Sequence, residues 1–165
     1  METENCLVLL TFPNVMDNRQ IKSEQFLNAA VTVLNFVRQL GVIFKPIEAD
    51  LNGNISTLKN ILNTDSAKFE IIASFQETDT GRNALLWLKR ALKFINLLLV
   101  ELLRDFQSGE CVDDLTSIMK IAYENSLRKY HSWFTQQVVN VCLNAAPNRS
   151  ELLQCLAKFI WKFNT

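Results

Sequence analysis

The sequence has few residues that interrupt helices. Only four glycines and three prolines occur in 165 residues, which disfavours disorder and the turn-rich architectures of β-sheet proteins. Hydrophobic residues make up 48% of the chain, and phenylalanine contributes 11 of them. A chain of this length can bury a sizeable core as one domain. The composition therefore predicts a single all-α domain over 1–165.

The sequence also lacks a net charge and any arrangement typical of a metal or redox site. Seventeen basic residues balance seventeen acidic ones, which gives no reason to expect a nucleic acid partner, although a local basic patch remains open. The four cysteines form no CxxC pair, which predicts free thiols in a reducing compartment. Because no supported nucleophile, metal-ligand spacing or glycine-rich phosphate loop occurs, we expect neither an enzyme nor a cofactor.

No apolar run is long enough to cross a bilayer. The most apolar internal stretch, at 91–103, contains Lys93, Asn96 and Glu101 and is shorter than the roughly 20 residues that a span needs. Acidic rather than basic residues precede the short apolar run at 6–12, so no signal peptide is expected. These features predict a soluble, cytoplasmic protein.

Apolar residues recur at helical spacing along most of the chain. The region around 82–106 carries apolar residues on two adjacent flanks, so this helix is expected to be buried on most sides. The fifth and sixth helices remain open to being one kinked segment. The spacing and its interruptions predict helices over about 23–44, 47–62, 67–77, 82–106, 113–127, 128–145 and 149–163.

A polar stripe lies within the second predicted helix. Its segment "ADLNGNISTLK" includes Gly53, which costs about 1 kcal/mol relative to alanine in a helix. Asp50, Asn54 and Thr57 fall within about 60° of one another around this helix. The row offers a carboxylate, an amide and a hydroxyl that could bind a ligand with several hydroxyl groups. The alternative is a polar face that is simply solvated.

Two further segments contain residues of possible binding sites. "NALLWLKRALKF" contains Trp87 and "LRKYHSWF" contains the only histidine, His131. A single tryptophan or histidine among apolar neighbours is more often part of the core than of a site, and both interpretations stay open at this point.

Taken together, four segments resemble the glycolipid transfer protein superfamily. "DLNGNIS", "LLWLKRALKF", "AYENSLRKYHSW" and "LNAAP" occur in the order and with the separations typical of that family, and the resemblance is strongest over 26–156. It implies an all-helical two-layer sandwich that holds a sphingolipid between its layers and catalyses no reaction. It also implies transient contact with a membrane surface.

The resemblance implies roles for individual residues. Asp50 and Asn54 match the acid and the amide that bind the lipid head group, and Trp87 matches the platform on which the first sugar stacks. His131 matches the side chain that bonds the ceramide amide, and Trp133 matches a membrane contact. The faces of the predicted helices suggest five residues that contact the lipid chains: Phe36, Leu40, Phe94, Leu98 and Val138.

The sequence departs from the family pattern at the head-group site. Thr57 stands where sugar-binding members usually carry lysine, which predicts weaker head-group binding. The presence of Trp87 still favours a glycosylated ceramide over ceramide-1-phosphate, because phosphate-selective members carry arginine there. Arg90, about one turn further along, leaves room for an anionic head group.

The family pattern continues beyond the end of this sequence with a further helix, so the C-terminal helix is expected to be missing. The functions that remain open are glycolipid transfer, a sphingolipid sensor or adaptor, and a shortened form without transfer activity. We expect a cytoplasmic protein that associates peripherally with membranes.

Overall fold

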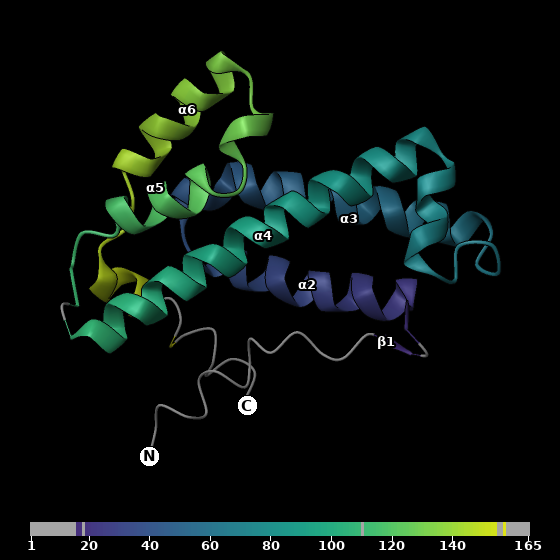
Figure 1. Cartoon of the computed structure of the whole chain (residues 1–165), viewed down its shortest axis with the longest axis horizontal. Coiled ribbons are helices and arrows are strands. Elements are labelled where there is room, and N and C mark those ends of the chain that lie inside the picture. The colour runs from purple at the N-terminus through teal and green to yellow at the C-terminus, as the bar shows by residue number, and fades with distance from the viewer. Residues whose placement is uncertain (1–15, 18, 110, 155–156, 158–165) are drawn as a thin grey trace.

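The computed structural model describes residues 16–17, 19–109, 111–154 and 157, which are mostly helical (Figure 1). The predicted all-α class is confirmed, since β1 and β2 form only a hairpin of two-residue strands. Residues 149–154 are also helical. The elements are β1 (Met16–Asp17), β2 (Gln20–Ile21), α2 (Ser23–Gln39), η1 (Val42–Phe44), α3 (Lys45–Thr64), η2 (Ile72–Glu77), α4 (Asp79–Ser108), α5 (Thr116–Glu124), η3 (Arg128–Tyr130) and α6 (Trp133–Asn144).

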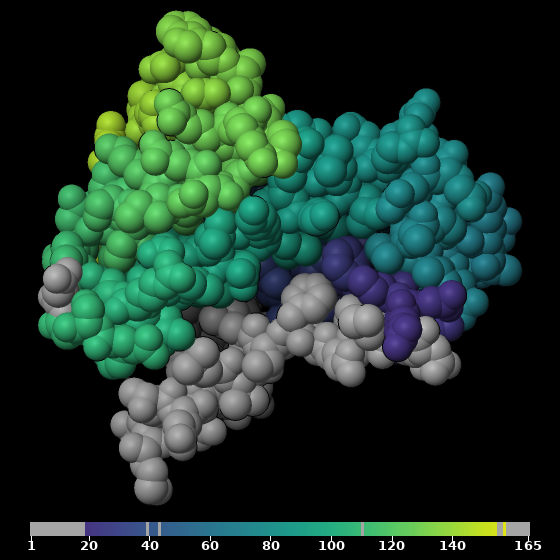
Figure 2. Space-filling view, viewed as in Figure 1, coloured from purple at the N-terminus to yellow at the C-terminus, as the bar shows by residue number. Residues whose placement is uncertain are grey.

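The long helix α4 organises the core. It packs against α3 and α5, and α3 also packs against α2 (Figure 1). Both of its apolar flanks face the core as predicted, while a strip through Arg82, Leu86, Lys89 and Lys93 stays exposed. Figure 2 shows α5 and α6 as a lobe that rises from α4. The buried residues of α4 are Gly81, Ala84, Leu88, Ala91, Phe94, Ile95 and Leu98.

Two predicted helix boundaries are wrong. α2 ends at Gln39, well before 44, because Gly41 adopts a φ of 93° and the chain continues as the short 3-10 helix η1. The α-helix predicted over 67–77 is instead a run of turns followed by the 3-10 helix η2. The Ser23 backbone N–H donates to the Glu70 carbonyl at 2.8 Å, and this pairing with the start of α2 holds the segment out of an α-helix.

The fifth and sixth predicted helices are separate elements. α5 is shorter than the predicted 113–127, and η3 lies between it and α6. α6 begins at a definite cap, because the Ser132 hydroxyl accepts a hydrogen bond from the Thr135 backbone N–H at 3.2 Å. The residue immediately before this cap is His131, so the break between η3 and α6 fixes the backbone of the only histidine.

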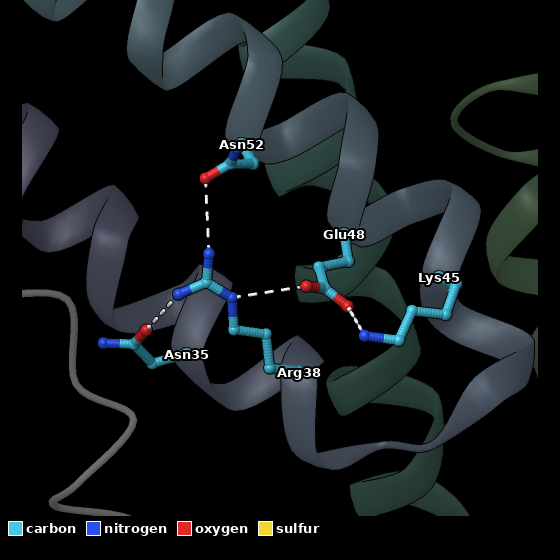
Figure 3. Close-up of polar contacts among 5 residues, drawn as sticks. All are labelled: Asn35, Arg38, Lys45, Glu48 and Asn52. Atoms are coloured by element: carbon cyan, nitrogen blue, oxygen red, sulfur yellow. Dashed lines mark hydrogen bonds and ion pairs between the residues drawn. The ribbon is translucent and has the colours of Figure 1, made fainter.

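A cluster of polar side chains joins α2 to α3 (Figure 3). The Arg38 guanidinium donates to Asn35 within α2 at 3.0 Å, and to Glu48 and Asn52 of α3 at 3.3 Å each. Lys45 donates to the second oxygen of Glu48 at 2.6 Å. These bonds draw the pKa of Glu48 below its usual value, chiefly through the hydrogen bond from Lys45. The cluster fixes the first turns of α3 against α2.

A second clasp connects the end of α4 to the chain that follows α6. The Arg149 side chain is mostly buried and pairs with the mostly buried carboxylate of Asp105. Its Nε also donates to the Val112 carbonyl at 2.9 Å, and its backbone N–H donates to the Asp113 carbonyl at 2.8 Å. Arg149 therefore holds three chain segments together at the base of the α5–α6 lobe.

Candidate functional site

An apolar cavity of about 250 Å³ lies where the start of α3 and the middle of α4 meet α5 and α6. Two of the predicted head-group residues, Asp50 and Trp87, line it together with His131, the predicted partner of the ceramide amide, although the three are far apart in the sequence. The remaining lining residues are Phe44, Pro46, Ile47, Ala91, Phe94, Met119, Tyr123, Leu127, Thr135, Val138, Val139, Cys142 and Leu143.

The indole of Trp87 and the imidazole of His131 stack on one another in this cavity. Their ring centroids are 5.9 Å apart, and their planes are inclined by 25°. Tyr123, a buried residue of α5, places its hydroxyl 3.0 Å from His131 Nδ1 and its ring 5.6 Å from the imidazole. Helix α4, helix α5 and the loop before α6 thus each contribute one ring to a continuous aromatic surface.

Burial lowers the pKa of His131 below its usual value of 6.5. The positive charge of Arg90 acts in the same direction, while the negative charge of Asp50 opposes both and raises the pKa. His131 is therefore neutral at physiological pH, with one ring nitrogen protonated and the other free to accept a hydrogen bond.

Asp50 behaves differently, because the residue as a whole is exposed and yet forms part of the lining of the apolar cavity. The resulting loss of hydration raises the pKa of Asp50 above 3.8, and a hydrogen bond from Asn54 partly offsets the rise. Asn54 Nδ2 donates to Asp50 Oδ1 at 3.1 Å and to the Asp50 backbone carbonyl at 2.8 Å. Asn54 thus orients the carboxylate and is not itself part of the cavity lining.

Thr57 and Arg90 lie outside the cavity lining. The Thr57 hydroxyl donates to the Gly53 carbonyl one turn back in α3, at 2.9 Å. The Arg90 guanidinium carbon lies 4.7 Å from the centre of the Trp87 ring and 3.6 Å from the centre of the Tyr130 ring. This cation–π stacking packs Arg90 against the tryptophan that lines the cavity.

The predicted chain contacts divide into two groups. Phe94 and Val138 line the cavity, whereas Phe36, Leu40 and Leu98 are buried in the core and contribute none of its lining. Sequence reasoning missed several lining residues, of which Tyr123 is the most important because it bonds His131. Tyr123 stands eight residues before His131 in the segment "AYENSLRKYHSW", and an isolated tyrosine gave no reason to pair the two.

Large apolar side chains are exposed near the cavity, along α6. Trp133 is 74% exposed, and Phe134 and Val141 are exposed to a similar degree. Phe134, Val138 and Val141 follow one another at helical spacing, which places them on one stripe of α6. The Trp133 position agrees with the exposure that a membrane contact requires.

Features of other classes of protein are not found in the described ranges. Within them, no three His, Cys, Asp or Glu residues are grouped so that they could hold a metal ion. None of the described helices combines the length and hydropathy needed to span a bilayer. Cys111 and Cys142 are free thiols as predicted, while Cys6 and Cys155 lie outside the described residues.

Comparisons with known proteins agree on one family. The family model named "Glycolipid transfer protein (GLTP)" matches residues 21–158. The chain is 32% identical over 163 residues to the glycolipid transfer protein of Danio rerio, covering 89% of this chain and 76% of that protein. It is also 32% identical over 157 residues to the glycolipid transfer protein of Xenopus tropicalis, covering 86% and 73% respectively.

Solved structures share the fold. A structure of FAPP2, described as selecting simple glycosphingolipids with the GLTP fold, superimposes with a TM-score of 0.74 at 27% identity, covering 89% of this chain and 75% of that one. Mouse ceramide-1-phosphate transfer protein in its apo form superimposes with a TM-score of 0.78 at 20% identity, covering 94% and 84%. The helical sandwich expected from the sequence is thereby confirmed, and the chain belongs to the glycolipid transfer protein family.

Proposed function

We propose that this protein binds a glycosylated ceramide and carries it between membranes without changing it chemically. The observation that supports this function best is the stacked pair of Trp87 and His131 in an apolar cavity beside Asp50. Sugar rings have partly apolar faces that pack on indole, while an amide removed from water needs a polar partner. In the cavity Trp87 can pack on a sugar and His131 can bond an amide, and the centroids of these two rings are 5.9 Å apart.

Each polar residue of the site then has a separate task. The Asp50 carboxylate, oriented by Asn54, accepts hydrogen bonds from sugar hydroxyls. The Tyr123 hydroxyl lies 3.0 Å from Nδ1 of His131, and we assign it as the donor, which leaves the proton of the neutral imidazole on Nε2. Nε2–H is then a donor for the carbonyl oxygen of the ceramide amide. Tyr123 thus selects the tautomer that His131 needs.

Lipid chains require the cavity to open. A volume of 250 Å³ is below the range that drug-sized ligands occupy, and a lipid with two chains is larger than such ligands. Phe94 and Val138 are in place to touch the first chain segments. The lipid chains can contact Phe36, Leu40 and Leu98 only when the core around these residues separates. The apolar surface that the bound chains then bury offsets the free-energy cost of this separation.

Membrane docking in this proposal uses the exposed side chain of Trp133, whose amphipathic ring suits a membrane interface. The apolar stripe of Phe134, Val138 and Val141 extends from Trp133 toward the cavity lining, to which Val138 belongs. The same function implies a cytoplasmic protein that binds membranes peripherally and needs no cofactor.

Head-group choice in the proposal favours sugar over phosphate. Thr57 offers no positive charge, and its hydroxyl proton is already bonded to the Gly53 carbonyl. Arg90 stacks on Trp87 and Tyr130 and stays available to an anionic substituent on the sugar. A neutral or sulfated sugar therefore fits these residues better than the phosphate of ceramide-1-phosphate.

The test is transfer of fluorescent galactosylceramide, sulfatide and ceramide-1-phosphate between vesicles, with Trp87→Ala beside the wild type. We expect galactosylceramide transfer to fall about ten-fold in the variant, since aromatic stacking and the buried ring area together contribute at least 1.5 kcal/mol. Leu86→Ala, at an exposed neighbouring position of α4, is the matched control and should transfer normally.

The outcomes separate the alternatives. Saturable binding with little transfer would identify a sensor or adaptor in place of a carrier. A folded wild-type protein that binds none of the three lipids would overturn the proposal.

Acidification should weaken glycolipid binding through His131. Bound lipid buries the imidazole further and favours its neutral form, so affinity should hold above pH 6.5 and fall as the pH drops through the lowered pKa. The free energy of unfolding should follow the same course. Because the pKa of His131 is lower in the folded state than in the unfolded state, its stabilising contribution is fully present above pH 6.5 and is lost as the pH falls below that value. Asp50, Arg90 and Tyr123 are the ionisable groups that face the ring.

The measurement for this prediction is binding of galactosylceramide vesicles between pH 8 and 5.5, with His131→Gln as the comparison. The glutamine amide can donate to the ceramide carbonyl and does not titrate, so its curve should be flatter than the wild-type curve. Parallel curves for the two proteins would contradict the assignment of this pH dependence to His131.

A further inference from the structure

A second, polar hollow lies on another side of α6. Its volume is about 330 Å³, and it is bounded by α5, η3 and α6. Most of its lining side chains are exposed and carry charges or amides, in contrast to the apolar lipid cavity. The lining residues are Lys120, Tyr123, Glu124, Arg128, Asn140 and Asn144.

The charges of this outer hollow favour an anion. Lys120 makes no hydrogen bond or ion pair within the described part of the chain, although its charge interacts with that of the Asp114 carboxylate, which lies outside the lining. Arg128 pairs with Glu124 at 3.7 Å, and both side chains are more than half exposed, so the pair is weak. Two cations and one carboxylate leave a charge of +1, and Asn140 and Asn144 add amide N–H donors.

The hollow lies on the side of α6 that carries Trp133. From Trp133, Asn140 is seven residues and Asn144 eleven residues further along, so the three fall within about 40° of one another around the helix. The separation from Trp133 to Asn140 is roughly 10 Å along the axis. A membrane that receives the Trp133 ring therefore lies close to the amides and cations of the hollow.

Tyr123 connects this hollow to the lipid cavity. Among the residues that the structure describes, it alone lines both. Its hydroxyl bonds His131 at 3.0 Å on the cavity side. A group held in the outer hollow would consequently be separated from the lipid site by one side chain.

We propose that the outer hollow binds the phosphate of an anionic phospholipid in the membrane on which the protein docks. Lys120 and Arg128 supply the charge, and the two asparagines supply hydrogen bonds to phosphate oxygens. The binding holds the side of α6 that carries Trp133 against the bilayer. This site is distinct from the glycolipid site, and its occupant stays in the membrane.

The test is co-sedimentation of the full chain with vesicles of phosphatidylcholine alone or with phosphatidylglycerol. Wild type should bind the anionic vesicles more tightly. Each of Lys120→Gln and Arg128→Gln should weaken that binding about five-fold, and the double variant about 25-fold, because each cation near an anionic surface contributes about that factor. Glu124→Gln should strengthen it, since the charge of the hollow rises from +1 to +2.

Lys93→Gln, an exposed lysine of α4 outside the hollow, is the matched control and should change binding by less than two-fold. Circular dichroism of each variant verifies its fold, and Glu124→Gln tests the site by a gain that misfolding cannot mimic. Equal loss from Lys93→Gln, or no gain from Glu124→Gln, would overturn the proposal. If inorganic phosphate binds the hollow but the wild type shows no preference for anionic vesicles, the ligand is a soluble anion. The proposal that the hollow binds a membrane phospholipid would then be wrong.

Discussion

Asp50→Asn is expected to weaken glycolipid binding by about 10- to 150-fold, because a hydrogen bond to a charged group is commonly worth 1.5 to 3 kcal/mol. The asparagine has nearly the same shape and can still accept the hydrogen bond from Asn54, which spans 3.1 Å in the wild type. The loss should therefore come from the missing charge and leave the helix intact. Vesicle transfer of galactosylceramide measures it.

The same substitution should raise the free energy of unfolding at neutral pH. Burial raises the pKa of Asp50 above 3.8, so the native state binds protons more readily than the unfolded state. The stabilising contribution of this group is fully present below pH 3.8 and is lost as the pH rises through the raised pKa. The stability gained by Asp50→Asn should accordingly be absent in acid and grow toward pH 7.

Urea denaturation at several pH values, followed by circular dichroism, tests the predicted change in the free energy of unfolding. Glu24→Gln serves as a control for the binding arm, because Glu24 is an exposed acid of α2 outside the cavity lining. A variant that loses stability and binding together would indicate that Asp50 supports the fold rather than the ligand. Binding at the wild-type level would remove Asp50 from the head-group site.

Gly81→Ala should destabilise the protein by about 2–4 kcal/mol, which combines the cost of overpacking with the loss of a helix cap. A Cβ at this position would lie 2.6 Å from the Phe75 carbonyl oxygen and 2.6 Å from Thr78 Oγ1. The first contact is with backbone, which cannot move aside cheaply. The second disturbs the cap of α4, where Thr78 accepts a hydrogen bond from the Gly81 N–H at 3.1 Å.

Gly53→Ala is the matched control with the opposite expected sign. No atom lies within 4 Å of the position that its Cβ would occupy, and the residue lies within α3. Alanine should stabilise the helix by about 0.5–1 kcal/mol. Urea denaturation of the two variants checks both values, and an alanine at 81 that leaves stability unchanged would contradict the close packing at the start of α4.

Sequence reasoning predicted the principal helices because their apolar periodicity and caps are local features. It failed at 67–77, where pairing of Glu70 with the start of α2 overrides local helix preference. Asp50, Trp87 and His131 were found through their segments rather than through their individual chemistry, since each residue type alone is usually structural.

The shape of the cavity could not be predicted in the same way. Helical spacing marks which residues face inward, but it does not say which part of the interior is hollow. Phe36 and Leu40 have the same periodicity as Val138, yet only Val138 lines the cavity. The contact between Tyr123 and His131 also escaped notice, because it depends on how η3 turns the chain between two helices.

The contacts made by Arg149 restrict how the apolar cavity can widen. Arg149 lies after α6 and bonds Asp105, Val112 and Asp113, which lie before α5. The chain that enters α5 and the chain that leaves α6 are therefore held together at one place. Since both ends of the α5–α6 lobe are anchored at that place, neither helix can move away from α4 on its own. We expect entry of a lipid to tilt α5 and α6 together about the Arg149 contacts. The displacement should be largest at the end of the lobe that carries His131 and Trp133.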